Sequence, residues 1–380
     1  MKIIIAGGSI AGLAAALTLD CIGHDVQIHE RSAAPLRGQG GGVAVLRRMM
    51  AFLEQHGHHC RDMISVPTHR RHWIDRDGAL ARDEPELLPF SSWDTVYRSL
   101  CSMLPPQRIH YGRQVTGFSQ DAEGVDVHFG EHTERADVLV AADGTGSALR
   151  AQIFPGYAPS FAGYIAWRGI VDEADFDAAA IATLVEYMTL HKAPGELFMA
   201  FLIPALDGSL AQGARRFNWL WYRNETDSES LRRHLTDRAG TVHHASIHPG
   251  ELSERSVETL RQLASERLPA VLSQLVMATR APFVQAIFDA LSPSFAHGRV
   301  ALIGDAACTL RPHTASGTSK AAHDAVSLAQ ALTPDAADAT DAANVVQRLA
   351  QWSAQRREEV ATLLARGPQL AASFGLGQPL

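Results

Sequence analysis

The sequence predicts an α/β fold with two domains, the first of which is assembled from separated pieces of the chain. Three observations support this prediction. The chain of 380 residues opens with a strand, a glycine turn and a helix. Its centre reads mostly as strands, and a buried strand followed by two long helices returns near the C-terminus.

The N-terminal segment has the pattern of a strand–helix–strand unit. The run KIIIA (2–6) has the β-branched composition of a buried parallel strand. The run SIAGLAAALTLDCIG (9–23) is rich in Ala and Leu and closes at a glycine, as many helices do. DVQIHE (25–30) is a second strand. This βαβ order indicates a Rossmann-like domain, a parallel sheet flanked by helices.

The centre of the chain predicts a β-sheet-rich insertion. Residues 66–83 alternate around the turn RDG, which is a hairpin signal. Residues 161–223 contain the runs GYIAWRGIV, ELFMAFLIP and RRFNWLWYRN, each of strand length. Helical patterns lie at residues 93–104, 227–239, 251–279, 316–332 and 344–365. The first domain is therefore predicted to comprise residues 1–65, 93–158 and 281–380, and the insertion residues 66–92 and 159–280.

Composition and charge exclude several classes of function. The net charge is −7 and no basic tract is present, so we expect no nucleic-acid partner. No segment reaches about 18 uninterrupted apolar residues, so we expect no membrane span. The four cysteines form no C-x-x-C pair, which favours a reduced, cytoplasmic setting. The run HGHHC (56–60) fits no zinc spacing, and we expect no metal site.

The first turn has the features of a dinucleotide site, with one departure. Gly7 supplies a tight turn and Gly12 permits close helix–strand packing. Ser9 stands where the G-x-G-x-x-G fingerprint has its second glycine, at the closest approach to the phosphates, and its hydroxyl could donate to them. Glu30 ends the second strand, where a carboxylate can accept from ribose hydroxyls. Alone, this motif is also compatible with an unrelated glycine turn.

Two further strands end in a turn that carries a carboxylate. ADVLVAADG places Asp143–Gly144 at the carboxyl edge of the sheet, where ligands of α/β folds bind. RVALIGDAA does the same with Gly304–Asp305. Residues 315–318 then open a helix, whose free N–H groups can stabilise the negative charge of a reduced cofactor ring.

In this order the three motifs resemble the single-component (class A) flavin-dependent aromatic hydroxylases, the para-hydroxybenzoate hydroxylase-like superfamily, over essentially the whole chain. The resemblance implies FAD as the cofactor, with its ADP half at the first turn and its isoalloxazine ring beside Pro312 and Gly317. It links Asp143–Gly144 to both FAD and NAD(P)H, and Asp305 to the ribityl chain. The expected cofactor contacts are Gly7, Ser9, Ile10, Ala11, Gly12, Glu30, Arg31, Arg98, Asp143, Gly144, Gly304, Asp305, Ala315, Ser316, Gly317 and Thr318.

The resemblance also implies an activity. NADH or NADPH would reduce FAD, and O₂ would add at the flavin C4a position. The resulting C4a-hydroperoxyflavin would hydroxylate an electron-rich aromatic or N-heteroaromatic carbon. GGSIAGL, GYIAWRG and the terminal FGLGQPL are most similar to a branch of the superfamily that acts on hydroxypyridines, in which Ser9 would be a shared trait. Family likeness favours a homodimer.

The sequence departs from the family pattern in two places. Many members carry an arginine where this chain has Tyr97, which makes the neighbouring Arg98 the expected flavin contact. The glycine that usually stands two residues before Gly317 is replaced by Ala315. The flavin turn is therefore expected to be less flexible, though still built from small residues.

The inserted domain is expected to bind the substrate. His313 is the first candidate for the group that accepts or stabilises the substrate's proton, with Pro312 and Tyr222 beside it, although a loop histidine can also serve only the backbone. In the strand FNWLWYRN one face carries Phe217, Trp219 and Trp221 and the other Asn218, Leu220 and Tyr222, and the pattern leaves open which lines the pocket. We expect Arg168 to pair structurally at the domain junction rather than to bind an anionic substrate.

Other flavoprotein functions remain to be separated from this one. A flavin-dependent halogenase is disfavoured, because Trp219-Leu220-Trp221 lacks the flanking residues of the G-W-x-W-x-I-P signature. A two-component monooxygenase or epoxidase would receive reduced FAD from a separate reductase. A non-catalytic flavin-binding protein would take up FAD without consuming oxygen.

Overall fold

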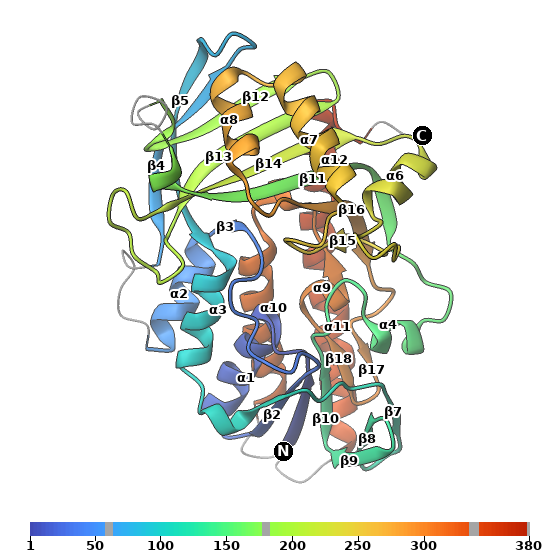
Figure 1. The fold of residues 1–380 in the computed structure, drawn as a ribbon. Helices are drawn as coiled ribbons and strands as arrows, with labels where there is room; N and C mark the ends of the chain where they lie inside the picture. The colour runs from blue at the N-terminus through green and yellow to red at the C-terminus, as the bar shows by residue number, and fades with distance from the viewer. Residues whose placement is uncertain (58–63, 177–182, 334–341, 378–380) are drawn as a thin grey trace.

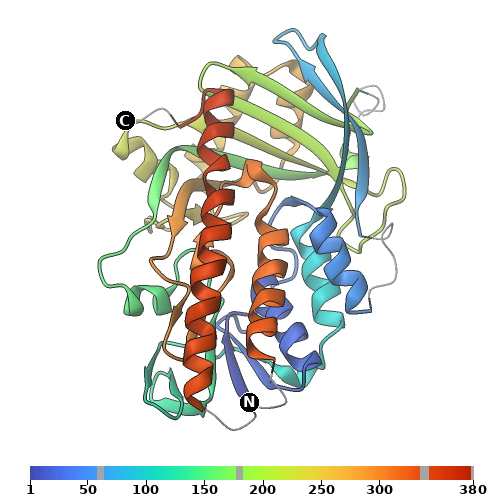
Figure 2. The ribbon, with the colours of Figure 1, turned by 180° about the vertical axis from the view of Figure 1, so that it is seen from behind.

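Two β-sheets lie at opposite ends of the molecule, and a long helix near the C-terminus runs alongside both (Figure 1, Figure 2). The computed structural model describes residues 1–57, 64–176, 183–333 and 342–377. The α/β fold predicted from the sequence, with its parallel sheet, β-rich region and C-terminal helices, is confirmed.

The lower sheet in Figure 1 is built from short β-branched runs. Its strand order is β17 (Ala296–His297), β18 (Val300–Leu302), β10 (Val138–Ala141), β1 (Lys2–Ala6), β2 (Asp25–Glu30) and β6 (Ile109–Tyr111). All of its pairings are parallel except that of β17 with β18. The side chains of Ile3, Ile4 and Ile5 are fully buried. The parallel direction brings the carboxyl ends of β1, β10 and β18 to one edge, as the motifs require.

The upper sheet is larger and mostly antiparallel. Its order is β15 (Ser246–Ile247), β16 (Phe283–Leu291), β11 (Ser160–Asp172), β14 (Arg216–Asn224), β13 (Glu196–Ile203), β12 (Tyr187–Ala193), β4 (Val66–Ile74), β5 (Leu80–Ser92) and β3 (Gly42–Ala44), with β19 (Cys308–Thr309) paired to β16. The predicted hairpin is β4–β5. A third, small sheet comprises β7 (Gly117–Gln120), β8 (Val125–Phe129) and β9 (His132–Ala136).

Helices cover both sheets. The α-helices are α1 (Ile10–Cys21), α2 (Arg47–Gln55), α3 (Trp93–Ser102), α4 (Ala148–Ile153), α6 (Ser228–His234), α7 (Glu254–Arg267), α8 (Ala270–Ala278), α9 (Gly304–Ala307), α10 (Gly317–Leu332), α11 (Ala342–Leu364) and α12 (Arg366–Phe374). Short 3₁₀ helices are η2 (Pro106–Arg108), η3 (Glu173–Asp175) and η4 (Pro312–Thr314). None of the described helices has the length and apolar character needed to cross a membrane.

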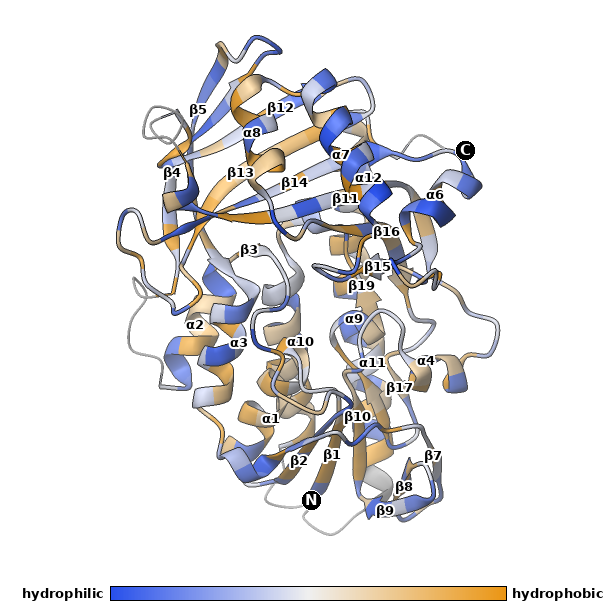
Figure 3. Ribbon diagram, in the orientation of Figure 1, coloured by the Kyte–Doolittle hydropathy of each residue, from blue (hydrophilic) through white to orange (hydrophobic). Residues whose placement is uncertain are grey.

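In the described part of the chain, the buried hydrophobic residues form three clusters, one around the lower sheet and one on each face of the upper sheet. One cluster lies around the lower sheet, where α1 is buried between the strands, α3 and α10. A second packs α7 and α8 against the outer face of the upper sheet. A third lies on the inner face of that sheet, toward the lower one. In Figure 3 hydrophobic residues run along β13, whereas α6 at the rim is hydrophilic.

Two predicted helices are shorter than expected. The pattern at 227–239 yields only α6, because the chain then turns at Gly240 and forms isolated bridges. The pattern at 251–279 begins at Glu254 and breaks at Pro269, which lacks a backbone N–H and caps α8 instead. The domain boundaries stay a prediction. Strands β3 and β16 come from segments assigned to the first domain, yet they pair within the upper sheet.

Candidate functional site

The first turn of the chain is held in place by backbone packing. Gly7 has φ +108°, and a Cβ there would lie 2.4 Å from the Ala142 carbonyl oxygen at the end of β10. A Cβ at Gly12 would lie 1.9 Å from the Gly7 carbonyl oxygen. Ser9 precedes α1, and its side chain makes no capping hydrogen bond. The start of α1 therefore keeps unpaired donors, as a pyrophosphate site requires.

Glu30 ends β2 and Arg31 follows it, but neither residue lines the cavity described below. The buried Glu30 carboxylate accepts hydrogen bonds from the backbone N–H groups of Gly8 and Ser32, each at 2.8 Å. Each carboxylate oxygen has a second lone pair, so Glu30 can both fix the turn and accept from a ribose hydroxyl. Arg31 is exposed.

The turn after β10 joins two of the motifs. Asp143 Oδ1 accepts from the Ser147 hydroxyl at 2.6 Å, and burial raises the pKa of this carboxyl. Gly144 lines the cavity. The buried Arg150 donates to the carbonyl oxygens of Asp305 at 3.3 Å and Ala306 at 3.1 Å. Arg150 thus ties the Asp143 turn to the Asp305 turn, a role that the sequence analysis missed.

A buried charged network fixes the turn after β18. Lys320 and Asp324 lie one helical turn apart on α10, and both side chains are 1% exposed. Lys320 Nζ donates to the Gly304 carbonyl at 2.7 Å and to Asp324 Oδ2 at 2.8 Å. Asp324 accepts from the Gly304 N–H and from Arg356 Nε, each at 2.8 Å. Both backbone groups of Gly304 are therefore held by α10.

This anchoring leaves the Asp305 carboxylate free. Among the described residues it has no hydrogen-bond or ion-pair partner, and it lines the cavity. Although the residue is exposed toward the cavity, desolvation by the surrounding elements raises the pKa of this carboxyl, an effect that Lys320 opposes. A carboxylate so placed can accept hydrogen bonds from the hydroxyl groups of a bound ligand.

The turn before α10 has the geometry of a helix N-terminus open to a ligand. Ala315 adopts the left-handed conformation, with φ +55°, which costs an alanine about 1 kcal/mol. Ser316 precedes α10, and its hydroxyl donates to the Thr314 carbonyl instead of capping the helix. The first N–H groups of α10 are therefore available, and the positive end of the helix dipole can stabilise negative charge nearby.

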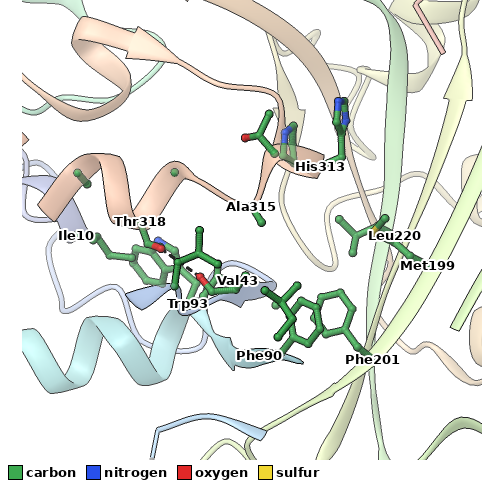
Figure 4. Close-up of a pocket in the computed structure, with 18 of the residues that line it drawn as sticks. Ile10, Val43, Phe90, Trp93, Met199, Phe201, Leu220, His313, Ala315 and Thr318 are labelled. Atoms are coloured by element: carbon green, nitrogen blue, oxygen red, sulfur yellow. Dashed lines mark hydrogen bonds between the residues drawn. The ribbon is translucent and has the colours of Figure 1, made fainter. Parts of the chain in front are cut away.

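These turns share one cavity with the upper sheet. It has a volume of about 580 Å³. Among the predicted residues, those that line it are Ser9, Ile10, Ala11, Gly144, Tyr222, Gly304, Asp305, Pro312, His313, Ala315, Gly317 and Thr318. The predicted residues outside its lining are Gly7, Gly12, Glu30, Arg31, Arg98, Asp143 and Ser316. Figure 4 shows Ile10 and Thr318 on one side of the cavity and Met199, Phe201 and Leu220 on the other.

The inner face of the upper sheet forms the apolar wall of this cavity. The rings of Phe90 and Phe201 stack with their centroids 3.7 Å apart. On β14, Leu220 and Tyr222 face the cavity, which decides the question left open by the sequence. Trp219 and Trp221 point the other way, into the core beneath α7 and α8.

Comparison with known proteins identifies the family. A family model described as FAD binding domain-like matches residues 161–289. The chain is 34% identical over 336 residues to the 2,6-dihydroxypyridine 3-monooxygenase of Paenarthrobacter nicotinovorans. The aligned region covers 87% of this chain and 83% of that protein. This chain belongs to the FAD-dependent aromatic hydroxylases. The family resemblance inferred from the three motifs is confirmed, and the hydroxylase is an FAD-dependent monooxygenase.

Solved structures share the architecture of the hydroxylase. The 2,6-dihydroxypyridine-3-hydroxylase of Arthrobacter nicotinovorans matches with a TM-score of 0.90 and 30% identity, covering 100% of this chain and 94% of that one. HpxO of Klebsiella pneumoniae, solved with FAD and uric acid, matches with a TM-score of 0.76 at 22% identity, covering 99% and 89%. The second likeness shows a shared fold.

The structure places three predicted side chains of the hydroxylase differently from expectation. His313 lines the cavity, but its Nε2 lies 3.1 Å from the Gly367 carbonyl and its Nδ1 3.4 Å from the Tyr164 hydroxyl. Burial lowers the pKa of His313, so the ring is neutral. Arg98 Nε donates to Asp94 at 2.9 Å and Nη2 to the Leu206 carbonyl at 2.8 Å, away from the cavity lining. Arg168, expected to pair at the junction, has no carboxylate partner among the described residues.

No metal site is found in the described ranges, where no three His, Cys, Asp or Glu side chains gather. The run at 56–60 follows α2, and residues 58–60 lie outside the described part of the chain. Cys308 is buried, and burial raises the pKa of its thiol to about 12, so it is a packed thiol rather than a nucleophile.

Proposed function

We propose that the hydroxylase inserts one oxygen atom of O₂ into a small hydroxylated N-heteroaromatic ring of the hydroxypyridine class. The observation that carries this proposal is that one cavity lies between two different walls. One wall consists of strand-end turns and helix N-termini suited to FAD, and the other is an apolar wall suited to a planar ring. The relative at 34% identity, named for 2,6-dihydroxypyridine, supports this substrate class.

On the lower wall, the residues fit FAD. Gly7–Gly12 and the start of α1 would take the pyrophosphate, with Glu30 at a ribose hydroxyl. Asp305 would accept from the ribityl hydroxyls, and Pro312 through Thr318 would flank the flavin ring. Bound FAD, reduced by NADH or NADPH, supplies the chemistry that activates O₂. The geometry gives no support to Arg31 or Arg98 as FAD contacts.

The rest of the reaction depends on what the chain does around the flavin ring. The α10 N-terminus stabilises negative charge at the cavity. Phe90, Phe201 and Leu220 keep water from the reacting carbon. Tyr222 presents a hydroxyl that has no protein partner in the described part of the chain, and that hydroxyl can hold a proton for the substrate oxygen. His313 Nε2 is held by the Gly367 carbonyl at 3.1 Å and Nδ1 has a longer contact of 3.4 Å with the Tyr164 hydroxyl, so we assign His313 to holding the Pro312–Ala315 turn rather than to acting as the base.

The proposal also includes the domain division, the oligomeric state and the cellular location. Residues 1–65, 93–158 and 281–380 would form the FAD-binding domain, and residues 66–92 and 159–280 the substrate domain. The homodimer and the cytoplasmic location stay predictions.

The test is oxidation of NADH and NADPH by the FAD-loaded protein with a panel of hydroxypyridines and matched phenols. We expect hydroxypyridines to stimulate oxidation most and to gain the mass of one oxygen atom. If phenols give the faster, coupled reaction, the substrate class is wrong. If neither NADH nor NADPH reduces the bound FAD, with or without substrate, the protein needs a separate reductase.

A further inference from the structure

Arg168 is one of two arginines on the described cavity lining. It lies on β11, opposite Leu220 of β14 and Phe283 of β16, and lines the cavity. Its guanidinium lies over the Phe283 ring, 5.4 Å from the ring centroid. Arg168 thus brings a permanent positive charge to a largely apolar wall.

The charge of Arg168 is poorly compensated. Nη1 lies 3.4 Å from Gln285 Oε1 and Nη2 3.4 Å from the Gly42 carbonyl, both at the long limit of a hydrogen bond. The buried Nε has no partner among the described residues, and none of their carboxylates forms an ion pair with this side chain. Arg311, by contrast, donates from Nε to Asp289 at 2.9 Å.

The other cation on the described cavity lining is already paired. Arg71, which also lines the cavity, forms an ion pair with Glu86. A desolvated guanidinium without a carboxylate is unfavourable, and a bound anion would relieve that cost. Because Arg71 has a carboxylate partner and Arg168 has none among the described residues, a bound anion is expected beside Arg168.

A second polar group faces the same space. Tyr222 is 1% exposed and lines the cavity, and its hydroxyl has no hydrogen-bond partner among the described residues. Burial raises the pKa of Tyr222 to about 12, while the nearby Arg168 charge opposes this rise. The hydroxyl therefore stays protonated at neutral pH and can donate. Burial lowers the pKa of the neighbouring His313, whose Nε2 is held by the Gly367 carbonyl at 3.1 Å.

We propose, on the basis of the proposed function, that Arg168 and Tyr222 together bind an ionised ring oxygen of the substrate and so select its anionic form. A charge-assisted hydrogen bond from Arg168 and a donated bond from the Tyr222 hydroxyl complete a site that the protein leaves unfilled. An ionised ring is also richer in electrons and more reactive toward an electrophilic oxygen. The same two side chains thus provide both affinity and the reactive form.

The test compares ligand binding to FAD-loaded wild type and R168Q, followed through the change in flavin absorbance. The ligands are 2,6-dihydroxypyridine, its neutral dimethoxy analogue, and nicotinate, which carries its charge on a carboxylate. We expect R168Q to raise the Kd of 2,6-dihydroxypyridine about 10- to 100-fold and that of the dimethoxy analogue less than about threefold. R168K should restore part of the loss, because it keeps the charge without the planar fork.

Two further measurements exclude a merely structural role. Wild-type binding should tighten as pH rises through the ligand's own ring pKa, and R168Q should lose that dependence. R71Q is the control, because Arg71 is already paired with Glu86. The Kd of the ionised ligand divided by that of the neutral ligand should differ between R71Q and wild type by less than about threefold. FAD occupancy and Tm, measured for each variant, show whether the fold is intact.

Three results would overturn the inference. The first is an equal loss for ionised and neutral ligands in folded, FAD-loaded R168Q. The second is an unchanged Kd for the ionised ligand. The third is a loss confined to nicotinate, which would make Arg168 a carboxylate site. If phenols rather than hydroxypyridines are the substrates but their anions depend on Arg168, the inference stands and only the proposed substrate class fails.

Discussion

The two walls of the cavity are built in different ways. The lower wall consists of backbone turns at strand ends, held by close packing at Gly7 and Gly12 and by the Lys320–Asp324 network. The upper wall consists of side chains on a β-sheet, among them Arg168, which has no carboxylate partner in the described part of the chain. A wall made of backbone can position a cofactor common to a family, whereas a wall made of side chains can change with the substrate.

The largest effect should follow a change in the backbone turn. Gly12→Val places new atoms against the Gly7 carbonyl, which must move, so we expect FAD binding to weaken at least about 100-fold. The measurement is fluorescence titration of the apoprotein with FAD. Gly146→Ala is the control, because a Cβ there meets nothing within 4 Å. Full FAD occupancy in Gly12→Val would refute the close-packing account of the lower wall.

The next effect should come from the charged network beneath that wall. Lys320→Met removes the donor to the Gly304 carbonyl and leaves Asp324 with only part of its compensation. We expect the free energy of unfolding to fall by about 2 kcal/mol and FAD to bind more weakly. Urea denaturation measures the first and FAD titration the second. Lys192→Met, at an exposed lysine, should cost less than about 0.5 kcal/mol; an equal loss in both variants would contradict the role of the network.

Ser9 provides a matched pair of variants at the same turn. Ser9→Gly restores the usual fingerprint and should keep FAD binding within about threefold of wild type. Ser9→Leu puts bulk at the closest approach to the phosphates and should weaken FAD binding about 20-fold. Spectroscopic FAD occupancy after gel filtration distinguishes the two. Retention of full occupancy by Ser9→Leu would show that the pyrophosphate does not pass this residue.

A change on the upper wall should leave the cofactor untouched. Phe201→Ala removes one ring of the stacked pair with Phe90, so we expect the substrate Kd to rise about tenfold. The FAD Kd should stay within about threefold. Substrate and FAD titrations on one preparation measure both values. A comparable loss of FAD affinity would break the separation of the two walls.

The smallest effect is expected at His313. Because the His313 ring is held by the Gly367 carbonyl and contacts the Tyr164 hydroxyl, His313→Gln should lower kcat only about threefold through a looser turn. The lowered pKa keeps the histidine neutral above about pH 6.5, so the pH profile of kcat should match the wild type there. A variant that loses a limb of the wild-type profile would make His313 the catalytic base after all.

The lower wall could be predicted from the sequence because its constraints are local. Each of its features can be recognised from a few neighbouring residues. These features are the tight turn at Gly7, the carboxylates that follow buried strands at Asp143 and Asp305, and the helix start at Gly317. The Gly304 anchor could not be predicted, because Lys320 and Asp324 reach Gly304, and Arg356 reaches Asp324, only once α10 packs beside the turn after β18 and α11 packs against α10. A lysine and an aspartate four apart in an apolar helix are its only local sign.

The upper wall was less predictable for a physical reason. Side chains alternate between the two faces of β14, but this pattern does not say which face lines the cavity. That is decided by α7 and α8, which bury Trp219 and Trp221 on the opposite face. The roles expected for His313, Arg98 and Arg168 depended on partners distant in sequence, such as Gly367 and Leu206. Only the broken helix at Pro269 had a local signal that could have been used.

One chain is expected both to hold FAD on the lower wall of its cavity and to hydroxylate a hydroxypyridine against the upper wall. A single-turnover experiment tests this expectation most directly. The FAD-loaded protein is reduced anaerobically with NADH or NADPH in the presence of 2,6-dihydroxypyridine and then mixed with O₂. We expect close to one hydroxylated product per bound FAD. Reoxidation of the flavin with no oxygen atom transferred to the ring would contradict the claim.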